Sequence, residues 1–260
     1  INPINWVVID EVELDENEVV NDVRSIYLTI SSRSKKKKEF IIYGVGKYRL
    51  EDLSVFGSFK IIDVISIVPD PTKPEANFKF KEIFQEVVKG AVTTITEISG
   101  RFLAGQGQKV IIRDLQQDNS TVPVAFLDCA TYISDSKSFG NLLLISDSMK
   151  SVWFLGFDAE PYRLILLGKD LQRLNAICTD FIVDNGEVYF LVADDEFNLH
   201  LLTYQPDDPK SLSGQRLLKR TTFTTNTLTT ALKMIPKYEE FDQGTASSSF
   251  QNIGVNVDGS

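Results

Sequence analysis

The chain has 260 residues, of which 43% are hydrophobic and 24% are charged. This is the composition of an ordinary globular protein with a sizeable core, and no apolar run approaches the ~20 residues that a membrane-spanning helix requires. The formal net charge of −9 disfavours general binding to nucleic-acid phosphates, although one local basic face would still be compatible with RNA contact.

The N-terminal part combines an expected strand with a dense group of carboxylates. Partial alternation of apolar and polar residues predicts a strand within residues 4–14. A run with no basic residue carries seven acidic side chains: Asp10, Glu11, Glu13, Asp15, Glu16, Glu18 and Asp22. Such a run favours a solvated edge and loop over a docking strip for a basic partner. Because the chain begins Ile1-Asn2-Pro3 and ends on a strand pattern at 255–260, we expect a fragment of a longer protein.

The next part of the chain contains four stretches with the β-branched and aromatic composition of strands. They are residues 23–30, 40–44, 57–68 and 78–88. The last stretch also fits a helical stripe, but its strand-rich context favours a strand. Between the first two, the polar and like-charged residues 31–38 predict a loop or hairpin tip. A targeting or RNA role for the four lysines of this run is the less favoured alternative.

Three further groups of four short strands follow, each separated by turn residues. They are 92–98, 102–104, 109–115 and 122–127; then 131–133, 142–145, 152–157 and 162–167; then 176–183, 188–193, 199–204 and 216–223. Asn185-Gly186 predicts a tight hairpin, since Asn-Gly tolerates the positive φ that such a turn requires. A last strand is expected at 228–235, and residues 243–249 form a Gly/Ser-rich loop.

Three segments share one pattern, in which an apolar run ends in a small residue, a polar or glycine turn follows, and a second apolar run begins. The small residues Ala104, Ser146 and Ala193 recur at intervals of roughly 40–50 residues. A β-rich repeat of this length is typical of a β-propeller with one four-stranded blade per repeat.

The sequence therefore predicts an all-β, WD-repeat-like β-propeller, of which residues 1–260 form part. The expected blades are 19–89, 91–128, 130–169 and 174–223, with partial-blade strands at 4–14 and 228–260. An open propeller exposes sheet faces and edges, so we expect this piece alone to be marginally stable or prone to association.

Few residues qualify as candidates for chemistry. The only histidine, His200, lies on an expected strand, and its pattern favours a surface or hydrogen-bonded residue over a Ser-His-Asp device. Residues 105–109 lack the Gly-Lys-Ser/Thr ending of a phosphate-binding loop and predict a hairpin turn. Residues 194–196 lack the ligand spacing of a calcium loop and predict a polar turn. Asp147 and Lys150 are expected in a turn whose polar groups tie neighbouring strands.

Cysteines and aromatic residues complete the candidates. Cys129 and Cys178 predict buried free thiols in a reducing compartment, and two cysteines with one histidine are too few for a structural zinc site. Five aromatic residues qualify by type as platforms for stacking bases, although packing between blades is favoured. They are Tyr132, Trp153, Phe154, Phe157 and Tyr162. We predict no catalytic, metal-binding or cofactor-binding residue and no cofactor, and partner-binding residues stay unassigned.

Seven segments, in their order and spacing, resemble the largest-subunit family of the cleavage and polyadenylation specificity factor, in its fungal form. The likeness covers about residues 24–235. Tyr204-Gln-Pro206 and Gln215-Arg-Leu-Leu-Lys-Arg220 favour this branch of a superfamily shared with the large subunit of damaged-DNA-binding protein and a splicing scaffold, whose common Asp-x-x-Lys/Arg-Ser turn is Asp147–Ser151 here. The chain departs from the family around 31–38 and 243–252. The seven segments are 60–69, 89–92, 107–110, 147–155, 180–185, 204–206 and 214–220.

The resemblance implies a three-propeller scaffold, with this chain as most of the third propeller, closed by strands from the N-terminal part of the parent protein. It implies a nuclear, non-enzymatic protein of pre-mRNA 3′-end processing. The implied partners are a zinc-finger subunit, a WD-repeat subunit, poly(A) polymerase and the endonuclease module, with weak or indirect contact to pre-mRNA and none with membranes or small-molecule substrates. The alternatives are a ubiquitin-ligase adaptor or splicing scaffold of the same fold, and a propeller hydrolase.

Overall fold

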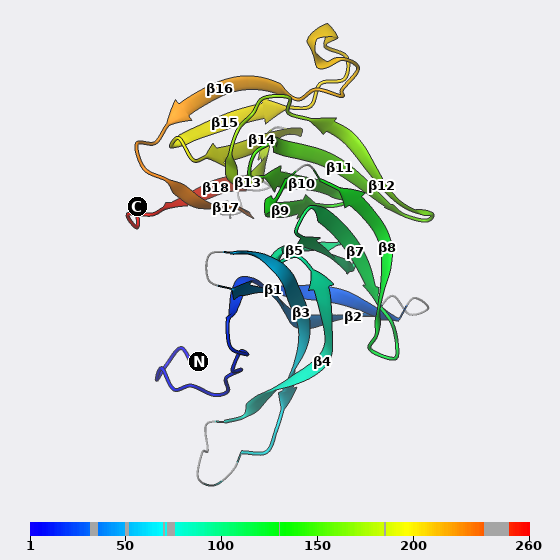
Figure 1. The fold of residues 1–260 in the computed structure, drawn as a ribbon, viewed down its shortest axis with the longest axis vertical. Helices are drawn as coiled ribbons and strands as arrows, with labels where there is room; N and C mark the ends of the chain where they lie inside the picture. Colours follow the sequence, from blue (N-terminus) through cyan, green and yellow to red (C-terminus); the bar gives the residue numbers. More distant parts are fainter. Residues whose placement is uncertain are drawn as a thin grey trace, which may run out of the picture. The chain divides into compact units, whose positions relative to one another are not determined.

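The computed structural model describes residues 1–31, 36–49, 52–69, 71, 76–129, 131–184, 186–236 and 250–260. Nearly all of the regular structure in this part is β-strand, with one short 3-10 helix, η1 (Pro209–Ser211) (Figure 1). None of its helices is long and apolar enough to cross a membrane. The chain divides into two compact units, residues 1–126 and 127–260.

The first unit contains two four-stranded antiparallel sheets in which consecutive strands are neighbours. The last two residues of the second sheet belong to the other unit. The first sheet consists of β1 (Glu18–Ser31), β2 (Lys36–Arg49), β3 (Asp52–Ser66) and β4 (Phe78–Lys89), and the second of β5 (Val92–Ile98), β6 (Arg101–Gln106), β7 (Lys109–Leu115) and β8 (Thr121–Asp128).

The core of the first unit lies between these two sheets. Alternate side chains of a strand point to the same face, so Phe59 and Ile61 of β3 face the second sheet together. The ring of Phe59 meets that of Phe102 on β6 edge-on, with 5.3 Å between centroids. Glycine permits the sheets to approach closely, because a Cβ on Gly44 would lie 2.5 Å from a methyl carbon of Val92.

Gly57 on β3 gives a first testable prediction. A Cβ added there would collide with the backbone oxygen of Val45 and would lie 2.7 Å from that of Gly90. Backbone cannot move aside as a flexible side chain can, so we expect Gly57→Ala to lower the free energy of unfolding by about 1–3 kcal/mol. Gly156→Ala is the matched control, because its Cβ would meet Leu167 at an ordinary 3.4 Å. Thermal unfolding of both variants tests this, and equal stability would contradict it.

The second unit contains two more four-stranded antiparallel sheets of the same strand order and one two-stranded sheet. The two four-stranded sheets consist of β9 (Ile133–Phe139), β10 (Leu142–Asp147), β11 (Ser151–Ala159) and β12 (Tyr162–Lys169), and of β13 (Ala176–Asp184), β14 (Glu187–Asp194), β15 (Asn198–Thr203) and β16 (Leu218–Thr224). The two-stranded sheet consists of β17 (Thr229–Pro236) and β18 (Phe250–Asn256).

Aromatic side chains dominate the core of this second unit. Phe154 on β11 packs against Phe190 on β14, with 4.6 Å between ring centroids, and against Tyr204 at 5.3 Å. Phe190 in turn meets Phe181 on β13 nearly edge-on. The contact between Phe154 and Phe190 joins the two four-stranded sheets, since tilted aromatic contacts add to the energy of burial.

The predicted fold class is confirmed, since sets of four-stranded antiparallel sheets, each following the chain, make a propeller-like all-β fold. Strands β13 and β14 form the hairpin expected there, because Asp184 pairs with Glu187 and Gly186 has φ +82°, while Asn185 itself lies outside the described residues. Residues 243–249, expected as a loop, lie outside the described residues.

Three local predictions were wrong. Residues 4–14 contain no strand, and Trp6 adopts a positive φ while the N–H groups of Ile4 and Trp6 bond within a local turn. The strand expected at 131–133 instead runs over Ile133–Phe139, a polar sequence with no apolar alternation. Residues 36–38, expected in a loop, belong to β2, where Lys38 is neutralised by Asp63 at 2.5 Å. The rest of that loop, residues 32–35, lies outside the described part.

Candidate functional site

Buried or partly buried carboxylates on the first strand of a sheet bind the first strand of the next sheet. In each case a side-chain oxygen accepts a hydrogen bond from a backbone N–H across the gap between sheets. The pairs are Asp22 with Ile95 (2.7 Å) in the first unit, and Asp135 with Thr179 (3.2 Å) and Asp180 with Met234 (2.7 Å) in the second. We call these three contacts the inter-sheet carboxylate bonds.

Two of these carboxylates differ in how their charge is compensated. Both carboxylate oxygens of Asp135 accept a hydrogen bond from the ammonium of Lys137, at 2.8 and 2.6 Å, in a buried ion pair. Asp180 forms no ion pair within the described part of the chain, and burial raises its pKa above the usual value, although the N–H groups of Met234 and Phe181 and the more distant charges of Lys137 and Lys233 act in the opposite direction. Both residues therefore stabilise the assembly of sheets and are not exposed to a substrate.

A second set of carboxylates closes the turns after the second strand of a sheet. Asp147, at the end of β10, accepts hydrogen bonds from the N–H groups of Met149 (3.0 Å), Lys150 (3.1 Å) and Thr131 (2.8 Å). The structure thus confirms the predicted turn, in which Lys150 takes part through its backbone. Asp194 at the end of β14 accepts in the same way from the N–H groups of Glu196 and Asn198.

His200 lies on β15, inside the sheet formed by β13 to β16. Its Nε2 lies 2.7 Å from Oδ2 of Asp194, and its Nδ1 lies 2.9 Å from the hydroxyl of Thr222. Burial would raise the pKa of Asp194, but hydrogen bonds from His200 and Asn198 outweigh it, and the pKa lies below its usual value. The histidine is 4% exposed, so it is a hydrogen-bonded strand residue, as the sequence predicted, and does not face a substrate.

The remaining candidates for chemistry also occupy structural positions. Residues 105–109 form the hairpin between β6 and β7, where Gln106 pairs with Lys109. Cys129 and Cys178 are free and buried, and burial raises the pKa of each thiol to about 12, so neither is a reactive thiolate at neutral pH. Within the described residues, no three His, Cys, Asp or Glu side chains are placed to hold a metal ion.

The five aromatic candidates divide between core and surface. Phe154 and Phe157 are 4% and 1% exposed and belong to the core. Tyr162 is exposed and stacks on Phe157. Tyr132 and Trp153 are half-buried, and the ammonium of Lys169 lies over the Trp153 ring. These side chains do not form the row of open rings on which a single strand of nucleic acid stacks.

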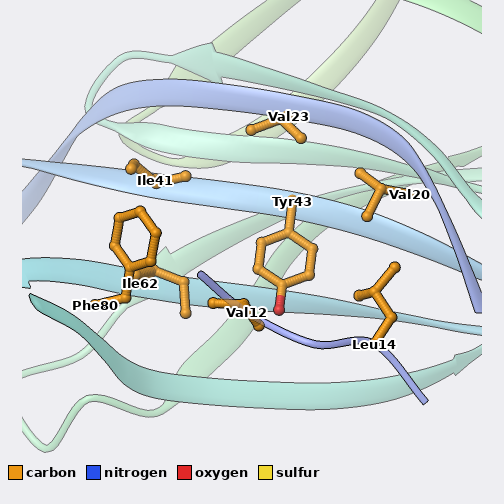
Figure 2. Close-up of a pocket in the computed structure, with 8 residues that line it drawn as sticks. All are labelled: Val12, Leu14, Val20, Val23, Ile41, Tyr43, Ile62 and Phe80. Atoms are coloured by element: carbon orange, nitrogen blue, oxygen red, sulfur yellow. The ribbon is translucent and has the colours of Figure 1, made fainter. Parts of the chain in front are cut away.

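An apolar pocket of about 300 Å³ lies on the face of the first sheet that points away from the second sheet. Figure 2 shows its lining, with the ring of Tyr43 in the middle and Val12 and Leu14 contributed by the N-terminal segment. The lining residues are Val12, Leu14, Val20, Val23, Ile41, Tyr43, Ile62 and Phe80. An apolar and partly open face of this kind is typical of a protein interface.

The N-terminal segment is tied across this face by one of its carboxylates. Oδ2 of Asp10 accepts a hydrogen bond of 2.7 Å from the N–H of Phe80 on β4. The acidic run is therefore not wholly solvated, since Asp22 also bonds Ile95. Sequence reasoning missed the pocket. The one sequence feature that pointed to it is that apolar residues occupy both odd and even positions of β2, which indicates a strand buried on both faces.

Substitution of Tyr43 in this pocket tests whether its hydroxyl lacks a hydrogen-bond partner. Its hydroxyl is buried and has no hydrogen-bond partner among the described residues, and burial raises its pKa. A buried unpaired hydroxyl destabilises the fold, so we expect Tyr43→Phe to raise the free energy of unfolding by about 1 kcal/mol. Tyr48→Phe is the control, because it removes a hydroxyl that donates to Asn21 and should be neutral or slightly destabilising. A loss of stability in Tyr43→Phe would show that the hydroxyl has a partner.

Comparison with known proteins assigns the chain to a family. Residues 1–260 match the sequence model of the family described as CPSF A subunit region. The chain is 54% identical to Protein CFT1 of Debaryomyces hansenii, 49% to Protein CFT1 of Saccharomyces cerevisiae and 48% to Protein CFT1 of Candida albicans. These alignments cover 100%, 100% and 98% of this chain, but only 19% of each relative. They confirm the resemblance inferred from the motifs: the chain belongs to the CPSF A subunit family.

Proposed function

We propose that the protein is a non-catalytic scaffold subunit of the nuclear machinery that cleaves and polyadenylates pre-mRNA. The observation that carries this proposal is the match of the whole chain to the CPSF A subunit family, at 54% identity to one fungal relative. The use of its buried polar groups supports a scaffold, because the carboxylates and His200 hold strands and sheets together.

In this proposal the chain is part of one propeller, and the rest of the protein covers its open faces. The apolar pocket around Tyr43 supports this, as does the two-stranded last sheet, whose Ile253 and Val255 are each 48% exposed. The chain spans only 19% of its relatives, so most of their length lies outside it. Partners in the assembly would be a zinc-finger subunit, a WD-repeat subunit, poly(A) polymerase and the endonuclease module, with pre-mRNA touched weakly or indirectly.

Depletion and restoration test the proposed function. We expect nuclear extract depleted of the full-length protein to lose both cleavage and polyadenylation of a pre-mRNA substrate, and added full-length protein to restore them. Intact 3′-end processing after depletion, with loss of splicing or of ubiquitin transfer, would favour the alternative adaptors of the same fold.

The non-catalytic part of the proposal has a separate test. Full-length protein carrying His200→Ala, shown by thermal unfolding to be folded at the assay temperature, should restore processing as the unmodified protein does. Hydrolytic activity of the purified protein that vanishes in this variant would contradict a pure scaffold.

A further inference from the structure

At one end of the sheet formed by β9 to β12, basic side chains and a tryptophan line a small cavity. The cavity measures about 320 Å³ and lies where the turn after β10, strand β11 and the loop from β12 to β13 meet. Lys150 comes from the turn, Trp153 from β11, Lys169 from the end of β12 and Arg173 from the loop. We call this the Trp153 hollow.

Asp170 also lines the hollow, but no ion pair joins it or Asp147 to these cations among the described residues. Both oxygens of Asp170 are engaged, one by the hydroxyl of Ser151 at 2.7 Å and the other by the N–H of Gln172 at 3.1 Å. Both carboxylate oxygens of Asp147 accept hydrogen bonds from backbone N–H groups. Among the described residues, no carboxylate lies within ion-pair distance of the three cations.

The hollow is also apolar at its floor and rim. Lys169 places its ammonium 5.7 Å from the centroid of the Trp153 ring, where the ring attracts the cation, and both residues line the cavity. Leu171 in the lining is 51% exposed, and Met149 in the adjacent turn is 56% exposed. A ligand that fits must therefore bring negative charge and apolar groups together.

These features favour a peptide over a nucleic acid. A single strand of RNA needs a basic groove that follows several phosphates and open aromatic faces for its bases. Here the cations surround one small cavity, the ring face is taken by Lys169, and the chain as a whole carries a charge of −9. Carboxylates from a short segment can meet the separate cations while apolar side chains enter between them.

We propose that the Trp153 hollow is a docking site for an acidic peptide segment of a partner protein, with Glu or Asp side chains on Lys150, Lys169 and Arg173 and an apolar side chain against Leu171. Lys150 and Arg173 are exposed and supply most of the attraction, while Lys169 and Trp153 form the fixed floor.

Binding of a fluorescent peptide to the full-length protein tests the proposal. The probe is a short synthetic peptide in which Glu and Asp alternate with Leu, and its partner probe carries Gln and Asn in place of the acids. We expect the acidic probe to bind, and Lys150→Glu or Arg173→Glu each to weaken it by about tenfold or more through like-charge repulsion. Lys219→Glu on β16, an exposed lysine of the same unit, makes the same charge change and should leave binding unchanged.

Several results would overturn the proposal. They are absence of binding by the acidic probe, equal binding of the Gln/Asn probe, an equal loss with Lys219→Glu, or preferential binding of single-stranded RNA or of a phosphopeptide. Thermal unfolding of each variant confirms that the substitution leaves the fold intact. The assay requires no processing complex, so its failure would leave the proposed function standing.

Discussion

Asp135→Ala is expected to be the most destabilising single substitution considered, lowering the free energy of unfolding by about 3–5 kcal/mol. It removes the inter-sheet bond to Thr179 and strands the ammonium of Lys137, whose side chain is only 13% exposed. A buried charge left without its partner carries the full cost of its desolvation. Chemical denaturation at neutral pH, with the midpoint and slope compared to the unmodified protein, measures the loss.

Two controls show whether burial is the cause. Asp158→Ala breaks an exposed pair with Arg163 of similar type and should cost at most about 1 kcal/mol. The double variant Asp135→Asn with Lys137→Met removes both charges while keeping an acceptor for Thr179, and should recover most of the stability. A cost for Asp135→Ala no larger than that for Asp158→Ala would refute the role assigned to the inter-sheet carboxylate bonds.

Asp194→Ala is the second large effect, with an expected loss of about 2–4 kcal/mol. The carboxylate accepts from the N–H groups of Glu196 and Asn198, from the side chain of Asn198 and from His200. Its removal leaves the N–H groups of the turn without their acceptor and leaves Nε2 of the buried His200 imidazole without its hydrogen-bond partner. Glu196→Ala in the same turn is the control, because that side chain is exposed.

The effect of Asp194 should depend on pH in a defined direction. Its pKa is lowered in the folded protein, so its contribution is fully present above the unfolded-state pKa and is lost as pH falls through the folded-state value. The difference in unfolding free energy between the unmodified protein and Asp194→Ala should therefore be constant near neutrality and shrink under acid conditions. If this difference in unfolding free energy instead grew on acidification, the pKa of Asp194 would not be lowered in the folded protein.

Much of the fold follows from sequence because most of its strands obey one pattern. Residues 92–98 and 109–115 alternate or run apolar between turn residues, and the structure places β5 and β7 at those positions. Strand β9 does not obey it: polar residues of this strand are buried because they form hydrogen bonds with other strands, as buried Asp135 accepts a hydrogen bond from the N–H of Thr179 at 3.2 Å. Hydrophobic periodicity cannot detect a strand whose burial depends on hydrogen bonds to partners distant in sequence.

The site was less predictable than the fold, for a related reason. The turn role of Asp147 could be inferred, since an Asp followed by small and polar residues satisfies nearby N–H groups. The inter-sheet bonds of Asp22, Asp135 and Asp180 could not, because their acceptors and donors lie far apart along the chain. The pocket around Tyr43 likewise joins the N-terminal segment to strands β1 to β4.

Purification of the tagged full-length protein from nuclear extract, followed by mass spectrometry, tests the central claim most directly. The proposed scaffold role predicts co-purification of poly(A) polymerase with zinc-finger and WD-repeat subunits and the endonuclease module, in stable proportions and at moderate salt. Cullin or spliceosomal proteins in their place would keep the propeller-like fold and contradict the proposed function.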